Sequence, residues 1–280
     1  MYKCMNPGAI GIRLPWKECL PLARASGFEG IDVPADPAVP ASEYRDALAA
    51  HALRPGGMGL PLNVRDDDAK FDAGLAALPA RARRAAEVGV TRVPTWILPF
   101  SDTRPLKENF RWHADRLGRA ARILAEHGCR LGLEFIGPKT ARIGHKYPFV
   151  RTMEHMLELC EAAGPNVGLL LDAWHWYTSL GTVEDILALE AKQVVYVHIN
   201  DAPAGIAVDQ QRDNVRALPG ETGVIDLAGF LGALAKIEYD GPVTPEPFVK
   251  DLASLAPADA ARRVGDALGR IWSLCPGTQK

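Results

Sequence analysis

Four residues that can bind a metal ion stand at or near the ends of four short apolar runs in the second half of the chain. They are Glu134 in LGLEF, Asp172 in LLLDAWH, His198 in YVHIND and Glu246 in TPEPF. A buried carboxylate is costly unless something binds it, and three carboxylates that share one site repel one another. A divalent cation relieves both penalties, and oxygen-rich ligation with a single histidine favours Mn²⁺ or Mg²⁺ and tolerates Co²⁺. We therefore expect these four residues to hold one divalent cation, Mn²⁺ in the first place.

These four residues can meet only if the strands that carry them end at the same side of one sheet. Short β-rich runs alternate along the chain with Ala/Leu/Arg-rich stretches of helical period, and the alternation repeats about eight times. The expected strands are 8–13, 28–33, 54–60, 91–97, 130–136, 167–172, 194–200 and 242–246. The expected helices are 15–27, 41–53, 71–89, 109–128, 149–164, 183–192, 226–239 and 258–274.

This alternation predicts an α/β protein, a single (β/α)₈ TIM barrel that forms one domain over residues 1–280. A doubly wound open sheet is the alternative, but no glycine-rich phosphate loop follows the first expected strand. In a barrel the last four strands would bring the four candidate ligands to the carboxyl-terminal mouth, where active sites form. The two longest irregular segments, 98–108 and 201–223, would be loops over that mouth.

Composition narrows the classes of partner and the compartment. Hydrophobic residues make up 48% and charged residues 24% of the chain, and the net charge of -2 gives no reason to expect nucleic acid as a partner. No apolar run is long enough for a membrane span or a signal peptide, which predicts a soluble, cytoplasmic protein. The five cysteines are far apart, lack a C-x-x-C pair, and are expected to be reduced packing residues.

Around the four candidate ligands the sequence resembles a known family, the xylose-isomerase-like sugar isomerases and epimerases, which includes D-tagatose 3-epimerase and hydroxypyruvate isomerase. The resemblance covers nearly the whole chain and is most specific in LGLEF, LLLDAWH, VHIND, LPGETGVID and YDGPVTPEPF, which stand in the family's order. It implies a TIM barrel whose cation is held by Glu134, Asp172, His198 and Glu246. It also implies that His175, three residues after Asp172, contacts substrate hydroxyls, and that barrels pair into dimers or tetramers.

The chain departs from the family pattern at two places. Thr222 stands where the family has glycine after P-G-E, and Gly223 follows it. The epimerases' substrate arginine, six residues after the metal histidine, is replaced here by Ala204. Arg212 or Arg216 in the long loop is expected to take over its role, and the identity of the substrate depends on this substitution.

The resemblance implies an enzyme that acts on a small sugar, a ketose or keto sugar with or without phosphate. Glu134 and Glu246 would face the two sides of the substrate carbon, so that one removes a proton and the other returns one through a cis-enediolate. The alternative on the same scaffold is a lyase, a keto-inositol dehydratase or an enzyme that cleaves keto-glycosides by β-elimination. A phosphodiesterase like endonuclease IV is disfavoured, because its multi-zinc cluster needs more histidines at the mouth.

Smaller predictions concern the rim of the site. His145 belongs to a basic loop that could meet a phosphate or carboxylate, and Trp112 is one of several aromatic residues near strand ends that suit a sugar pocket. Asn200 and Asp201 are expected to brace the end of the strand that carries His198.

Overall fold

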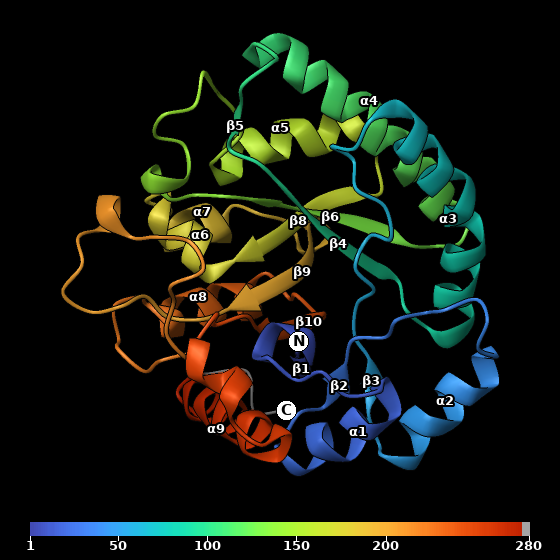
Figure 1. The fold of residues 1–280 in the computed structure, drawn as a ribbon. Helices are drawn as coiled ribbons and strands as arrows, with labels where there is room; N and C mark the ends of the chain where they lie inside the picture. The colour runs from blue at the N-terminus through green and yellow to red at the C-terminus, as the bar shows by residue number, and fades with distance from the viewer. Residues whose placement is uncertain (276–280) are drawn as a thin grey trace.

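Eight parallel strands curve into a barrel at the centre of the molecule (Figure 1), in a computed structural model that describes residues 1–275. The strands follow the order β3-β2-β1-β10-β9-β8-β6-β4. The amides of Met58 and Leu60 donate to the carbonyls of Arg92 and Pro94, which joins the segment after β3 to β4 and closes the barrel. The strands are β1 (Tyr2–Met5), β2 (Gly30–Ile31), β3 (Arg54–Pro55), β4 (Arg92–Ile97), β6 (Arg130–Phe135), β8 (Val167–Asp172), β9 (Val194–Ile199) and β10 (Pro242–Pro245).

The helices form an outer ring around these strands (Figure 1). Within the described residues they are α1 (Trp16–Ala25), α2 (Ala41–Ala50), α3 (Asp68–Val88), α4 (Leu106–Ala125), α5 (Met153–Ala163), α6 (Ala173–Thr178), α7 (Val183–Leu187), α8 (Leu227–Lys236) and α9 (Pro257–Ser273). Strands inside and helices outside are the (β/α)₈ arrangement, so the predicted TIM barrel is confirmed. Each of these helices is too short or too polar to cross a membrane.

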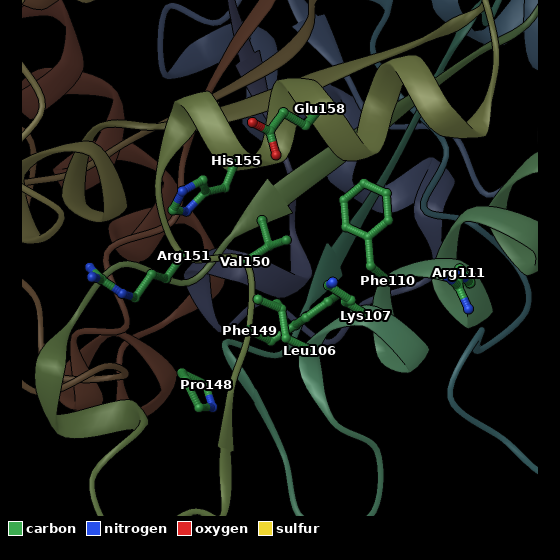
Figure 2. Close-up of a pocket in the computed structure, with 10 residues that line it drawn as sticks. All are labelled: Leu106, Lys107, Phe110, Arg111, Pro148, Phe149, Val150, Arg151, His155 and Glu158. Carbon is green, nitrogen blue, oxygen red and sulfur yellow. The ribbon is translucent and has the colours of Figure 1, made fainter.

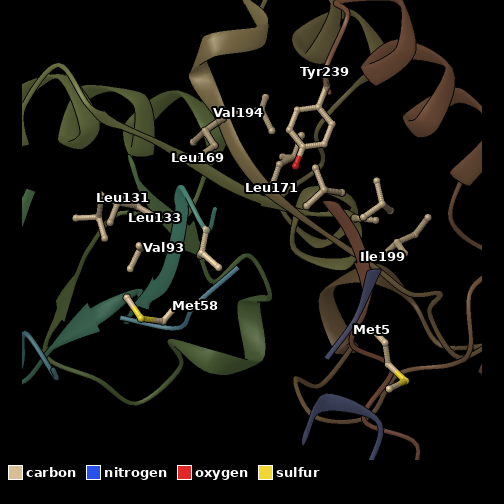
Figure 3. Packing of buried hydrophobic residues seen from close by; sticks show 14 of the residues in the cluster. Met5, Met58, Val93, Leu131, Leu133, Leu169, Leu171, Val194, Ile199 and Tyr239 are labelled. Carbon is tan, nitrogen blue, oxygen red and sulfur yellow. The ribbon is translucent and has the colours of Figure 1, made fainter. Parts of the chain in front are cut away.

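Alternation along the strands separates the core from the site. Leu131 and Leu133 of β6 and Leu171 of β8 are fully buried in the hydrophobic cluster of Figure 3. Successive side chains of a strand point to opposite faces, so Glu134 and Asp172, which follow Leu133 and Leu171, point to the barrel interior. Packing of these leucines in the core therefore fixes the two strands that carry Glu134 and Asp172.

Several helix ends follow from local sequence. Asp67 caps α3 by accepting a hydrogen bond from the amide of Lys70, and the helix ends at Gly89, whose φ of 91° suits glycine. Thr152 caps α5 in the same way through the amide of His155. Each cap satisfies an amide that would otherwise lack a partner.

The first strand is where the predicted elements differ most from the structure. Residues Gly8–Ile10 form a 3-10 helix, and the strand that pairs with β2 and β10 lies earlier, at Tyr2–Met5. Gly11, with a φ of 81°, turns the chain after the 3-10 helix. The prediction of a strand over 8–13 was wrong. It relied on the alternation of Gly8, Ile10 and Ile12, which is typical of a strand, but pairing with β2 and β10 decides which segment becomes the strand.

Three further features of the structure bear on the predictions. Neither helix α6 nor the small antiparallel pair of β5 (Phe100–Ser101) with β7 (Tyr147–Pro148) was predicted from the sequence. The amide of Phe149 donates to the carbonyl of Pro99 and extends this pairing. All five cysteines are free and buried, as expected of reduced packing residues.

Candidate metal centre

Glu134, Asp172, His198 and Glu246 lie together at the carboxyl-terminal end of the barrel. Asp172 of β8 and His198 of β9 are direct register partners, and Glu246 follows β10 with its amide bonded to the carbonyl of Ile199. The strands β6, β8, β9 and β10 are consecutive neighbours, so Glu134 and Glu246 flank the other two residues at the ends of an arc. One ligand atom from each of the four residues lies within 4.8 Å of all the others.

His198 is the centre of this cluster. Its Nδ1 atom lies 3.1 Å from Glu134 Oε1, 3.4 Å from Glu246 Oε2 and 3.8 Å from Asp172 Oδ2. Ligands on opposite sides of a divalent ion with bonds of about 2.1 Å are separated by about 4.2 Å. The donor set of three carboxylates and one imidazole, at these spacings, therefore fits one divalent cation.

The excess of negative charge in the cluster changes the pKa of its members. Burial, together with the charges of Glu246 and Asp172, raises the pKa of Glu134 to about 7. Burial alone would lower the pKa of His198, but Glu246, Glu134 and Asp172 raise it to about 10. Both shifts mean that the cluster favours added positive charge, which a divalent cation supplies.

Asp172 is the most constrained of the four residues. It is fully buried, and its Oδ1 atom accepts hydrogen bonds from the amides of Trp174 and His175, so it also caps α6. Its Oδ2 atom accepts from Arg216 at 2.9 Å and from Asn200 at 3.2 Å. Burial would raise the pKa of Asp172, but the charge of Arg216 and these donors lower it well below its usual range.

We call the four candidate ligands Glu134, Asp172, His198 and Glu246 the metal cluster. Arg216 connects this cluster to the loop between β9 and α8. Its Nη1 atom also donates to Glu246 Oε2 at 3.2 Å, and its Nη2 atom donates to Asp213 Oδ1 at 3.0 Å. A buried guanidinium needs such partners, because an unpaired buried charge costs several kcal/mol. The sequence left Arg212 and Arg216 as alternatives for the loop arginine at the site, and Arg216 is the one that contacts the metal cluster.

His175 lies on α6 beside the cluster. The amide of Gly137 donates to its Nδ1 atom at 3.2 Å, and Arg216 Nη2 lies 3.0 Å from its Nε2 atom. Burial lowers the pKa of His175 to about 4, so the imidazole is neutral near pH 7. Both ring nitrogens of His175 therefore face N–H donors, and a neutral imidazole accepts at only one of them.

A cavity of about 360 Å³ opens beside the cluster, and we call it the site cavity. Its lining combines Glu134, Glu246, His175 and Arg216 with apolar and aromatic side chains. The latter are Trp96, Leu98, Pro99, Phe100, Ile136, Ala141 and Phe248, and Asp213 and Asn214 complete the lining. Pockets for small molecules have this composition, a mainly apolar wall with a few convergent polar groups.

Three residues expected at the substrate lie outside the lining of the site cavity. Arg212 is exposed and lines a neighbouring hollow with Asp213. His145 stacks on Phe100 at 3.2 Å between ring centroids and bonds Asp102, so it lies behind an aromatic residue of the cavity wall. Trp112 lies on α4, with its ring in contact with two arginines of that side of the barrel. Contact of these three residues with substrate therefore stays a prediction.

Asp201 organises the loop that carries Arg216. Its carboxylate accepts hydrogen bonds from the amides of Thr222, Gly223 and Ile225 at 2.8 to 3.0 Å. These hydrogen bonds fix the conformation of the LPGETGVID segment, because three of its amides donate to one aspartate. Asn200 and Asp201 therefore brace the end of β9 as expected, the first through Asp172 and the second through this loop.

A polar network beneath the cluster had no counterpart among the expected site residues. Tyr196, two residues before His198, donates its hydroxyl to Asp32 Oδ1 at 2.7 Å and lies 2.7 Å from Thr244 Oγ1. The amide of Gly57 donates to the same Asp32 oxygen at 2.7 Å. Burial raises the pKa of Asp32 to about 6. The signal in the sequence was the position of Asp32 at the end of an expected strand, the same position that marked Glu134.

Replacing Tyr196 with phenylalanine tests the structural weight of this network. Tyr196→Phe is expected to lower the free energy of unfolding by about 1–3 kcal/mol, because Asp32 and Thr244 lose a buried partner. Urea unfolding followed by circular dichroism measures the change. Tyr147→Phe, at a half-buried position in β7, is the matched control and should change stability by less than about 0.5 kcal/mol. Equal stability of Tyr196→Phe and the parent protein would contradict the prediction.

A second, larger cavity of about 570 Å³ lies away from the cluster, between α4 and α5 (Figure 2). Apolar side chains of α4 and of the segment 148–151 line it together with basic side chains, and α5 contributes His155 and Glu158. The lining contains none of the four candidate metal ligands. The chemistry therefore belongs to the smaller site cavity.

Comparisons with known proteins agree with this geometry. The family model described as "Xylose isomerase-like TIM barrel" matches residues 20–270. An inosose isomerase from Bacillus velezensis is 24% identical over 89% of each chain. A 3-dehydroshikimate dehydratase from Pseudomonas aeruginosa is 34% identical over 48% of this chain, which is 22% of that protein.

Solved structures give the same picture. A xylose isomerase domain protein from Alicyclobacillus acidocaldarius has a TM-score of 0.87 and 32% identity, over 98% of this chain and 99% of that one. The IolI protein with a bound zinc atom has a TM-score of 0.80 and 21% identity, over 97% and 98% of the two chains. The curated relatives carry the names of isomerases, epimerases and a dehydratase. This chain is an enzyme that belongs to the xylose isomerase-like TIM-barrel family.

Proposed function

We propose that this enzyme is a divalent-metal-dependent isomerase or epimerase that acts on a ketose or related keto sugar through a cis-enediolate. The observation that carries the proposal is the convergence of Glu134, Asp172, His198 and Glu246 within 4.8 Å of one another beside a cavity of ligand size. The names of the curated relatives, an inosose isomerase and a ketose 3-epimerase among them, support the same class of reaction.

The two glutamates are proposed as the groups that move the proton. They flank the cluster and both line the site cavity, so each can face one side of a substrate carbon. One carboxylate removes the carbon-bound proton and the other returns a proton to the opposite face or to the adjacent carbon. Epimerisation needs both groups, whereas transfer between adjacent carbons needs only one.

The remaining residues orient the substrate. His175 lines the site cavity and can contact a substrate oxygen there. Arg216 holds Asp172 and Glu246 in place through its hydrogen bonds. Glu134, Asp172, His198 and Glu246 would hold a divalent cation, which when bound would stabilise the negative charge that develops during the reaction. We propose Mn²⁺ as that cation. Zinc belongs among the metals to be tested, because the IolI structure of the same fold holds zinc.

A lyase is the second candidate. The observation that favours it is the likeness to a 3-dehydroshikimate dehydratase at 34% identity over 48% of this chain. A carbanion beside a carbonyl group can expel a leaving group from the next carbon, so the same two glutamates serve elimination as well as isomerisation. Both reactions begin with removal of the carbon-bound proton. They differ in the next step, which is return of a proton in the isomerase and loss of a leaving group in the lyase.

One experiment separates these candidates. The purified enzyme is incubated in D₂O with Mn²⁺, Mg²⁺ or Zn²⁺ and a panel of ketoses, keto-inositols and keto-glycosides, and the mixtures are followed by NMR. We expect metal-dependent deuterium uptake at the carbon next to the carbonyl group, together with a new sugar isomer. Deuterium uptake with loss of water or of an aglycone instead supports the lyase. Failure of every compound to exchange, with each of the three metals present, contradicts both candidates.

A further inference from the structure

Arg65 lies at the mouth of the barrel, on an aromatic residue of the site cavity. It belongs to the loop between β3 and α3, and its guanidinium carbon lies 3.6 Å from the centre of the Trp96 ring. Trp96 is the register partner of Glu134 on the neighbouring strand and lines the site cavity, with 44% of its surface exposed. The arginine therefore stacks on a residue whose register partner is a proposed catalytic glutamate.

No carboxylate forms an ion pair with Arg65 in the part of the chain that the structure describes. Its Nη1 atom is buried and lacks a hydrogen-bond partner there. Burial lowers the pKa of the Arg65 guanidinium, and the opposing effect of Asp66 is smaller. The Asp66 carboxylate accepts a hydrogen bond from Asn63 instead. A half-buried guanidinium without an anion is costly, and an anionic ligand would remove that cost.

Charged groups of both signs surround Arg65, since Asp66, Asp67 and Asp68 follow it in the sequence and two further arginines lie near the same histidine, His113. Burial lowers the pKa of His113 to about 4, and the charges of Arg65, Arg104 and Arg116 act in the same direction. Arg116 is paired with Asp68, whereas Arg104 lies over the Trp112 ring.

We propose that Arg65 binds a carboxylate of the substrate, so that the substrate is a polyhydroxy ketone that also carries a carboxylate group. This inference rests on the proposed function, in which the carbonyl end of the substrate faces Glu134 and Glu246. A guanidinium suits a carboxylate because its planar N–H groups match the two oxygens, and the indole of Trp96 keeps that plane in one orientation. Arg65 is then the residue that selects acidic over neutral sugars.

Binding of shikimate and its amide, shikimamide, tests this inference. The two cyclohexene triols differ only in charge at the carboxyl position, and neither requires turnover. We expect isothermal titration in the presence of Mn²⁺ to show shikimate binding roughly tenfold or more tightly than shikimamide. Arg65→Gln should remove this preference, and Arg65→Lys should keep part of it. Arg104→Gln is the matched control, because Arg104 also lies on a tryptophan ring, and should keep the full preference.

Two results would overturn the inference. One is shikimate that fails to bind or binds no more tightly than shikimamide, and the other is a preference that survives in Arg65→Gln. Thermal unfolding of each variant shows whether it is folded. A carboxylate preference without deuterium exchange in any ketone would contradict the proposed function alone. Exchange in neutral ketoses without a carboxylate preference would contradict only the role of Arg65.

Discussion

Glu246→Gln is expected to lower kcat by at least about a thousandfold, because an amide neither accepts nor returns the proton that the reaction moves. Glu246 lines the site cavity, and its Oε2 atom lies 3.4 Å from His198 Nδ1 and 3.2 Å from Arg216. The substitution keeps the shape of the side chain, so the loss reports on chemistry more than on packing. Turnover measured by NMR with the best ketone from the panel gives kcat and KM separately.

Glu134→Gln is expected to lose nearly as much turnover, and the two variants should differ in exchange. Each variant keeps one carboxylate, so each can still exchange the proton on one face of the carbon in D₂O. An exposed glutamate on α4, in Glu108→Gln, is the control and should leave kcat unchanged. Bound Mn²⁺ measured by elemental analysis separates loss of the base from loss of the metal. Full activity in either active-site variant would contradict the assignment of two bases.

The four candidate ligands were accessible from the sequence because each stands at the end of a buried strand. A barrel brings such ends together by its topology, so no knowledge of side-chain contacts was required. Asp32 stands at a comparable place, but its strand β2 has only two paired residues and its partner Tyr196 is far away in sequence. The strand-end pattern therefore indicates which residues face the mouth and does not distinguish a ligand from a residue that supports one.

The loop residues were less accessible because their positions depend on long-range contacts. Arg212 and Arg216 are four residues apart in the same loop, and only Arg216 is buried against Asp172. Hydrogen bonds from backbone amides to the Asp201 carboxylate fix the conformation of that loop, and no local periodicity in the sequence indicates them. Asp213, a partner of Arg216, was missed for the same reason.

Asp172→Asn is expected to weaken Mn²⁺ binding by about a hundredfold or more and to lower the free energy of unfolding by about 3–5 kcal/mol. The amide nitrogen would face the donors of Arg216 or Asn200, and the buried guanidinium would lose one of its counter-charges. The same carboxylate caps α6, so the start of that helix, which carries His175, would also be affected. Isothermal titration with Mn²⁺ and urea unfolding measure the two effects independently.

Asp213→Asn is the matched control for this prediction, because Asp213 also bonds Arg216 but its side chain is 26% exposed. Its loss should cost no more than about 1 kcal/mol of stability, since solvent screens a partly exposed pair. Mn²⁺ affinity should stay unchanged in this variant, because Asp213 is outside the cluster of four ligands. An Asp172→Asn protein that binds Mn²⁺ and resists urea as well as the Asp213→Asn protein would contradict the placement of Asp172 at the metal.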